Sequence, residues 1–462
     1  MKRTAVLNVV GLTESLLGPA TPRINRFLAQ GAKSAVVPAF PAVTSTAQST
    51  YLTGTTPAQH GIVGNGWYNR DLAEVQFWKQ SNHLVHGRKI WEELRELEPD
   101  FTCAKLFWWH NMYSSADYSI TPRPMYPADG RKFFDIYSWP YSIRTEIKKD
   151  LGEFPFPTFW GPAAGVKTPQ GAPDAATRWI AESAKWIEKK YLPSLNLVYL
   201  PHLDYNLQRL GPKHSDVARD LREIDAIVGE LIDFFTKHSV QVILLSEYGI
   251  TQVDTPIHIN RILRQYNWLA IKEELGREML DCGASAAFAV ADHQIAHIYL
   301  NNPDIAEQVR SALPDGVQVL DRKEQASLGI DHPRAGDLLA IAPENAWFTY
   351  YYWLDDNVAP DFARCVDIHR KPGYDPAELF LDPKIPAVKL KILRRLLQKK
   401  LGFRMLMDVI PLDATLVKGS HGCRPSNPGD QPLLITSRPE LLPSKQIEAT
   451  DVYHIIKRHV LY

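Results

Sequence analysis

The sequence predicts an α/β fold whose central sheet is mostly parallel. Short, almost continuously apolar segments alternate with longer segments of helical periodicity, first in residues 5–10 and 21–32. The same alternation returns in residues 195–200, 215–235 and 240–245. Strands that are apolar throughout and separated by helices are typical of a parallel sheet covered on both faces. We therefore expect helices on both sides of one main sheet.

Each of these elements has its own signal. Residues 5–10 form a buried strand by their apolar run, and residues 21–32 place Ile24, Phe27 and Leu28 at helical spacing. Ligands of parallel sheets bind beyond the carboxyl ends of the strands. Asp204 and Glu247 follow two of the predicted strands, so we expect them near a functional site.

Two regions interrupt the alternation. Residues 105–175 and 347–383 are rich in aromatic residues and proline, and we interpret them as insertions in a single domain that spans residues 1–462. Between residues 386 and 401 the pattern returns to that of a basic helix. Such insertions complete a core more often than they bind a ligand, although loops near the strand ends can wall a pocket.

Composition excludes several classes of protein. Lysine plus arginine and aspartate plus glutamate each number 52, so no global field attracts a nucleic-acid polymer or an anionic membrane. The apolar stretch near the N-terminus lacks a cleavage pattern, and we interpret it as a strand rather than a secretory signal. No apolar run approaches the roughly 18 residues of a membrane span. With four scattered cysteines and no CxxC pair, we expect a cytoplasmic protein with reduced thiols.

Residues 38–68 carry the most informative pattern, because a proline-bounded loop delivers Thr44 to the start of a predicted helix. Free N–H groups and the positive end of the helix dipole would stabilise a phosphoryl oxyanion and an ionised threonine there. A threonine hydroxyl is a poor nucleophile by itself and needs a metal or a base as partner. By its local pattern alone, a threonine before a helix is far more often an N-cap than a nucleophile.

This segment, PAFPAVTSTAQSTYLTGTTPAQHGIVGNGWY, resembles the nucleotide pyrophosphatase/type I phosphodiesterase family of the alkaline phosphatase superfamily. The residues that match the family pattern in order are Thr44, Thr53, Gly54, Pro57, His60, Gly61, Asn65 and Gly66. The segments LNLVYLPHLDYNLQRLGP, VILLSEYG and GSHG resemble later landmarks of the family, so the resemblance covers nearly the whole chain. It implies an alkaline-phosphatase-like three-layer α/β/α core with Thr44 as the nucleophile.

The resemblance also implies two divalent metal ions, usually zinc, at the carboxyl edge of the sheet. Asp204 and His421 match two ligands of one ion, while the histidine expected four residues after Asp204 is Gln208. At the other ion, Glu247 and Tyr248 replace an aspartate and a histidine, and Val10 replaces an aspartate. The sequence thus predicts a divergent centre with one or two ions.

Other polar side chains are candidates to complete this centre. Gln48 follows Ala47, which stands where the resemblance implies a phosphoryl-binding asparagine. His202 precedes Asp204 by two positions, a spacing that would place both on one face of a strand. Further candidates are Asp292, His293, His297, Asp367 and His369, and each is more commonly a hydrogen-bonded structural residue than a ligand.

These observations favour a hydrolase that cleaves phosphodiester or pyrophosphate bonds of a small-molecule phosphate ester through a phospho-Thr44 intermediate. A catalytically inactive family member that binds a phosphate ester, or serves as a scaffold, is the alternative. A third hypothesis is an enzyme acting on a specialised metabolite, in which Glu247 and Tyr248 transfer protons.

Overall fold

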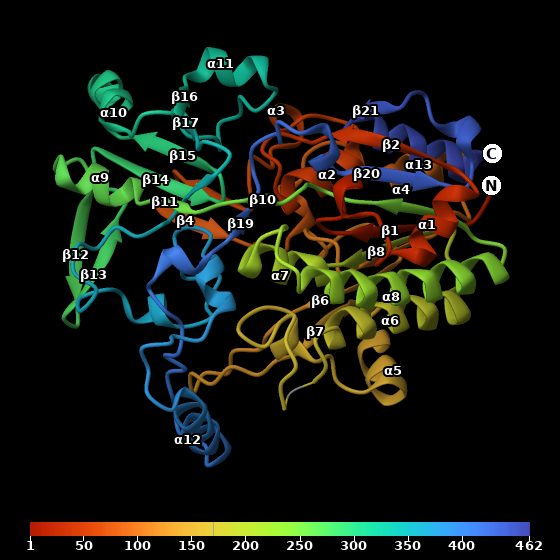
Figure 1. Ribbon diagram of the computed structural model, residues 1–462, viewed down its shortest axis with the longest axis horizontal. Coiled ribbons are helices and arrows are strands. Elements are labelled where there is room, and N and C mark those ends of the chain that lie inside the picture. Colours follow the sequence, from red (N-terminus) through yellow and green to blue (C-terminus); the bar gives the residue numbers. More distant parts are fainter. Residues whose placement is uncertain (170) are drawn as a thin grey trace.

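The computed structural model describes residues 1–169 and 171–462 and is built around a nine-stranded sheet (Figure 1). From one edge to the other, the strands are β21 (Gln446–Glu448), β2 (Ala32–Val37), β20 (Leu433–Thr436), β9 (Gln241–Leu245), β1 (Thr4–Val9), β8 (Leu195–Leu200), β5 (Cys103–Leu106), β6 (Tyr118–Pro122) and β7 (Ile136–Trp139). Strand β1 is parallel to both of its neighbours, β8 and β9. Only β20 and β7 run antiparallel to the strands beside them, so the sheet is mostly parallel as predicted.

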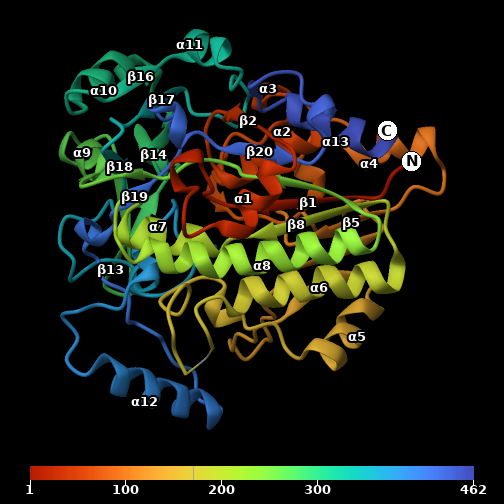
Figure 2. The same cartoon turned by 45° about the vertical axis from the view of Figure 1, so that its right-hand side comes forward.

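Helices cover both faces of this sheet (Figure 2). On one face α6 packs against β5 and β8, and α8 packs against β9, α1 and α7. On the other face α13 packs against β1, β21, α2 and α4. The bounds are α1 (Pro22–Ala29), α2 (Thr44–Thr53), α4 (Ile90–Leu97), α6 (Ala175–Tyr191), α7 (His202–Leu210), α8 (Val217–Lys237) and α13 (Asp451–Leu461). The three-layer α/β/α core is therefore confirmed.

The first helix ends earlier than its apolar spacing predicts. Helix α1 stops at Ala29, and β2 already begins at Ala32, inside the range predicted as helix. Gly31 connects the two, and a Cβ atom built on it would lie 1.9 Å from the carbonyl oxygen of Thr436. Only glycine fits where the chain passes this close to β20, and the turn there ends the helix.

A second, antiparallel sheet lies beside one end of the main sheet (Figure 1). Its strands are, in order, β14 (Ala287–Asp292), β15 (Ile295–Leu300), β17 (Leu338–Ile341) and β16 (Gln318–Leu320). With α9 (Ile259–Gln265) and α10 (Ala306–Ala312) it surrounds its own apolar core, and α11 (Arg322–Ser327) contacts β16. The turn between β14 and β15 carries His293, the residue after Asp292.

The remaining elements are short or lie at the periphery. Strands β5, β6 and β7 belong to the aromatic-rich region 105–175 or directly precede it, and they extend the edge of the main sheet, followed by α5 (Ser142–Leu151). Helix α12 (Val388–Lys400) projects from the body of the protein (Figures 1 and 2). Across residues 1–169 and 171–462, no helix combines the length and apolar character needed to cross a bilayer. The other short elements are α3 (Pro57–His60), β3 (Gly66–Asn69), β4 (Glu74–Phe77), β10 (Thr251–Gln252), β11 (Thr255–Ile257), β12 (Ala270–Glu274), β13 (Arg277–Asp281), β18 (Ala346–Phe348) and β19 (Gly419–Ser420).

Candidate active site

Thr44 is the first residue of helix α2 and is buried. Val43 before it is extended, and the helix ends at Gly54, whose positive φ of 67° suits a left-handed C-cap. The Thr44 Oγ1 atom lies 3.2 Å from the hydroxyl of Tyr248, which follows Glu247 beyond the end of β9. The predicted nucleophile therefore sits at a helix N-terminus beside the carboxyl edge of the sheet.

A chain of hydrogen bonds runs from Thr44 into the protein. The Tyr248 hydroxyl donates to Asp204 Oδ1 at 3.1 Å, and Gln208 Nε2 donates to Asp204 Oδ2 at 2.9 Å. Tyr374 donates to Gln208 Oε1 at 2.7 Å and closes the chain. Because the single proton of Tyr248 is directed to Asp204, the hydroxyl of Thr44 donates to Tyr248 in this arrangement. The Thr44 hydroxyl is thus linked to the carboxylate of Asp204 through the phenol of Tyr248.

Glu247 is fully buried in the site and accepts hydrogen bonds from two side-chain amide groups. Asn8 Nδ2 and Gln48 Nε2 both donate to its Oε1 atom at 2.5 Å, while Gln48 Oε1 accepts from the backbone N–H of Trp109 at 2.6 Å. Burial raises the pKa of Glu247 to about 8, against the opposing effect of these hydrogen bonds. Burial likewise raises the pKa of Asp204 to about 6. The two carboxyl groups are stabilised by neutral donors rather than by arginine or lysine.

His421 follows β19 and contributes an imidazole with one free nitrogen. Its Nδ1 atom lies 2.7 Å from the carbonyl oxygen of Ala42, and a carbonyl only accepts, so Nδ1 carries the proton. Nε2 is buried without a hydrogen-bond partner and exposes a lone pair. Burial, with His293 nearby, lowers the pKa of His421 well below its usual value, which keeps this ring neutral.

The rings in this part of the site form a stack. The ring of His421 lies parallel to that of Tyr248, with centroids 3.6 Å apart, and its other neighbour is His293 at 3.7 Å. His293 in turn stacks on Tyr374 at 3.5 Å. Tyr248 and Tyr374 are thus joined both by this stack of rings and by the hydrogen bonds through Asp204 and Gln208.

Asp292 supports the loop beside Thr44. Its carboxylate accepts from the backbone N–H of Asn65 at 2.7 Å, from Asn65 Nδ2 at 3.0 Å and from His293 Nδ1 at 2.8 Å. Asn65 Oδ1 then accepts from the backbone N–H of Ser45 at 3.0 Å. Asp292 and His293 thus position Asn65 against the first turn of α2.

Sequence reasoning missed two residues of this site and the contact made by a third. Asn8 approaches Glu247 from β1, and its one signal is that it is a polar residue within an apolar strand. Asn65 was recognised only as part of the family pattern, and its contact with Ser45 was not foreseen. Tyr374 lies in the second aromatic-rich region, and nothing in its local sequence indicates a contact with Gln208.

The side chains present do not fit the two-ion centre that the resemblance implies. Val10 offers no ligand atom, the oxygen of Gln208 accepts from Tyr374, and the hydroxyl of Tyr248 donates to Asp204. Both oxygens of Asp204 already accept hydrogen bonds from these neighbours. Among the described residues of the site, the buried side-chain atoms without partners are Glu247 Oε2, His421 Nε2 and the amide oxygen Asn8 Oδ1. Such a set is too small for two zinc ions with about four ligands each.

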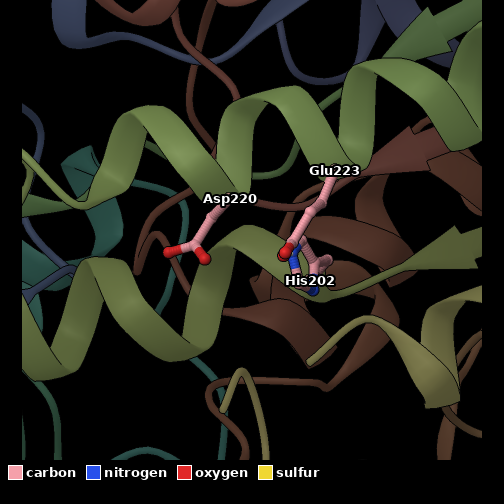
Figure 3. A group of neighbouring side chains, drawn as sticks. All are labelled: His202, Asp220 and Glu223. Carbon is pink, nitrogen blue, oxygen red and sulfur yellow. The ribbon is translucent and has the colours of Figure 1, made fainter. Parts of the chain in front are cut away.

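His202 lies elsewhere than its spacing predicts. It begins helix α7 together with Asp204, and on a helix two positions correspond to about 200°, so the expectation of a shared strand face is wrong. Its Nε2 atom lies 2.9 Å from Glu223 Oε2 of α8, and Asp220 lies beside them (Figure 3). In the described parts of the chain this is the one group of three histidine, cysteine or acidic residues with donor atoms within 4.8 Å of one another. Arg219 pairs with Asp220 at 3.2 Å and balances part of its charge.

The remaining histidine candidates have structural partners. His297 Nε2 donates to the carbonyl oxygen of Val63 at 3.0 Å, and its Nδ1 accepts from the backbone N–H of Gly336 at 3.1 Å. His369 Nδ1 lies 3.3 Å from the carbonyl oxygen of Phe77, and Asp367 pairs with Arg370 at 3.6 Å. None of these hydrogen bonds or ion pairs involves Thr44.

Comparison with known proteins identifies the family of this chain. The family model for type I phosphodiesterase/nucleotide pyrophosphatase matches residues 4–375. An uncharacterized pyrophosphatase/phosphodiesterase of Schizosaccharomyces pombe is 21% identical over 286 residues, which are 60% of this chain and 49% of that protein. The match therefore spans about half the length of this curated relative.

Solved structures share the fold. Murine ectonucleotide pyrophosphatase/phosphodiesterase 5, as an inactive threonine-to-alanine variant in complex with AMP, has a TM-score of 0.57 and 14% identity, covering 100% of this chain and 95% of that one. The human form has a TM-score of 0.59, 13% identity and the same coverage. Since the family model covers most of the sequence, including the whole of residues 38–68, this chain belongs to the type I phosphodiesterase/nucleotide pyrophosphatase family.

Proposed function

We propose that this protein hydrolyses phosphodiester or pyrophosphate bonds of a small-molecule phosphate ester through a phospho-Thr44 intermediate. The observation that carries the proposal is the hydrogen-bonded chain from Thr44 through Tyr248 to Asp204 at the start of α2. Family membership and the AMP complex of the murine neighbour support the substrate class. The inactivity of that neighbour's threonine-to-alanine variant supports a nucleophilic threonine.

The chain's own residues can perform the first step. Thr44 Oγ1 attacks phosphorus and forms a P–O bond as the bond to the leaving alcohol or phosphate breaks. The Thr44 proton passes to Tyr248, whose proton passes to Asp204, so that no alkoxide stands alone. The positive end of helix α2 stabilises the charge on the phosphoryl oxygens. Water then cleaves the Thr44–phosphate bond, and the proton returns along the same chain.

Glu247 is placed to take part in proton transfer at the leaving group. Glu247 is fully buried, and its Oε2 atom has no hydrogen-bond partner. This oxygen is therefore free to exchange a proton with an oxygen atom of the substrate. This role incorporates the hypothesis that Glu247 and Tyr248 form an acid/base pair.

We place a single divalent ion, zinc in our proposal, at this site. His421 Nε2 and Asp204, which match two ligands of one family ion, would hold it once Asp204 releases one of its protein donors, with Glu247 Oε2 as a further candidate ligand. In the described parts of the chain these three residues do not bring their donor atoms within 4.8 Å of one another, so an ion would have to draw them together. A bound ion would supply charge stabilisation for the phosphoryl oxygens. Metal analysis of the purified protein tests this part separately from turnover.

The rival function is that of an inactive family member that binds a phosphate ester without turnover or serves as a scaffold. The replacement of expected metal ligands by Val10, Gln208 and Tyr248 favours it. We would screen phosphodiesters, nucleotide pyrophosphates and phosphomonoesters with the wild type, Thr44→Ala and Thr46→Ala. Thr46 is the matched control because its hydroxyl lies on the same helix but donates to the carbonyl oxygen of Ile62 at 3.1 Å.

The expected result is turnover that Thr44→Ala abolishes and Thr46→Ala retains, together with a phosphate group on Thr44 in acid-quenched samples analysed by mass spectrometry. Substrate binding by the wild type with no product and no modification would instead establish the rival.

A further inference from the structure

Helix α12 and the segment after it form a basic, leucine-rich surface that the active site does not use. Between Val388 and Met407 the chain has seven lysine or arginine residues and no acidic residue. Its exposed apolar side chains, here called the α12 surface, are Leu390, Leu393, Leu396, Leu397, Leu401, Phe403 and Leu406, each between 41% and 74% exposed. A soluble protein seldom leaves so many large apolar groups together in water without a partner.

The opposite side of the helix is fixed to the protein. Val388 and Ile392 pack against Ala377, Val409 and Ile410. Lys391 and Arg395 both pair with Asp408, at 2.8 and 3.1 Å. The helix is therefore anchored by one side and presents the other outward.

The outward side has a regular arrangement. Leu390, Leu393, Leu397 and Leu401 follow one another at intervals of three and four, so they form one stripe along the helix. On the 3.6-residue turn, Lys389 and Lys400 fall along one border of this stripe and Arg394 along the other. All three cations are exposed.

The surface continues onto a neighbouring segment. Arg404 Nε donates to the carbonyl oxygen of Asp129 at 2.6 Å, and Lys399 Nζ lies 5.1 Å from the ring centroid of Phe134. These contacts place α12 beside residues 125–134, where further large side chains are exposed. They are Met125, Tyr126, Phe133 and Phe134, with Arg131 and Lys132 between them.

We propose that the α12 surface binds the surface of an anionic phospholipid membrane. The leucine stripe would enter the boundary between head groups and acyl chains, while Lys389, Arg394 and Lys400 contact lipid phosphates. Aromatic side chains such as Phe403 and Tyr126 prefer this interfacial depth. The chain lies on the membrane and does not span it.

Other occupants fit the observations less well. In a two-fold contact between copies of this chain, the surface would face itself and set cations against cations. A partner protein could not enclose α12 on all sides, because Val388 and Ile392 already pack against the rest of the chain. Nucleic acid would neutralise the cations but leave the leucines exposed. A flat anionic surface with an apolar interior satisfies both features at once.

Vesicle flotation tests the proposal, with phosphatidylcholine alone and phosphatidylcholine containing 30% phosphatidylserine as the two probes. The variants are Leu393→Ser with Leu397→Ser, and Lys389→Glu with Arg394→Glu and Lys400→Glu. The matched control carries the same charge change at exposed sites elsewhere, Lys149→Glu with Lys237→Glu and Lys323→Glu. Thermal melts verify that every variant is folded.

We expect the wild type to partition at least tenfold more strongly to the anionic vesicles, with a decrease at high salt. Both α12 variants should lose at least tenfold in binding, while the control retains it. Equal binding by the charge-reversed α12 variant and the control would overturn the proposal. So would vesicle-free dimerisation that the leucine variant abolishes, or binding to a single-stranded oligonucleotide in place of vesicles.

Discussion

Helices α2 and α12 reverse the usual relation between polarity and burial. Helix α2 consists largely of threonine, serine and glutamine, yet each of its ten residues is buried. Helix α12 is rich in leucine, yet none of its residues is buried. Local composition therefore predicts the wrong environment for both helices.

A polar helix such as α2 is stable inside a protein when its side chains find hydrogen-bond partners. Within α2, Gln48 donates to Glu247, Tyr51 donates to the carbonyl oxygen of Ser246 at 2.9 Å, and Thr53 donates to that of Ser49 at 2.8 Å. An unpaired buried polar group costs about 1–3 kcal/mol, so these bonds are what permits the burial. Helix α12 meets this requirement differently, because Lys389, Arg394 and Lys400 remain in water while Lys391 and Arg395 pair with Asp408.

The largest expected effect comes from breaking the link between α2 and Asp204. Tyr248→Phe removes the hydroxyl that contacts Thr44 and Asp204, and we expect turnover to fall about 10²–10³-fold. Tyr51→Phe is the matched control, because it also removes a buried hydroxyl from this region but one that does not contact Thr44. Steady-state kinetics on a phosphodiester measure the turnover of both variants. A similar decrease in turnover in both would mean that Tyr248 has only a structural role.

The second effect is a pH dependence of stability in chelator-treated protein. The pKa of Glu247 is raised from 4.5 to about 8 in the folded state, so between these values the folded protein retains a proton that the unfolded chain releases. The free energy of unfolding should therefore fall as pH rises through this interval, by about 2–4 kcal/mol. Asp204, with its pKa raised to about 6, adds to the slope below that pH.

Urea titrations between pH 5 and 8 measure this slope. Glu247→Gln should flatten it, because the amide cannot ionise, while Glu98→Gln at an exposed site should leave it unchanged. A slope identical in the wild type and Glu247→Gln would show that this carboxyl group is not the source.

The smallest change in stability is expected for substitutions on the exposed side of α12. Leu393→Ser with Leu397→Ser should change the free energy of unfolding by less than about 0.5 kcal/mol, since both side chains are already exposed. Gln48→Ala in α2 should cost about 1–3 kcal/mol, because Glu247 and the N–H of Trp109 lose a partner. Denaturant unfolding monitored by circular dichroism measures the free energy of unfolding of both variants. A loss of more than about 1 kcal/mol in the leucine variant would contradict the exposure of these two side chains.

Much of the fold could be predicted because its signals are local. Apolar runs identified β1, β8 and β9 to within one residue, and helical periodicity identified α8 and α12 to within two. The position of Asp204 and Glu247 after strand ends also predicted that both lie near a functional site. In the structure Asp204 accepts from Tyr248, which contacts Thr44, and Glu247 accepts from Gln48 of the same helix as Thr44.

The partners within the site could not be predicted in the same way. Asn8 and Glu247 are 239 residues apart, and Gln208 and Tyr374 are 166 apart, so only the folded chain brings them together. The prediction that His202 and Asp204 share a strand face was wrong for a local reason. Strand β8 ends at Leu200, and helix α7 begins two residues later at His202.

The sequence by itself determined the family, the three-layer core and the position of Thr44 at a helix start, since each depends on patterns within a few tens of residues. Tertiary structure alone decided which polar groups are paired and which stay free, from the amides on Glu247 to the leucines of α12. The physical reason is that hydrogen bonds and burial depend on distances between segments, and these distances exist only once the sheets and helices have packed.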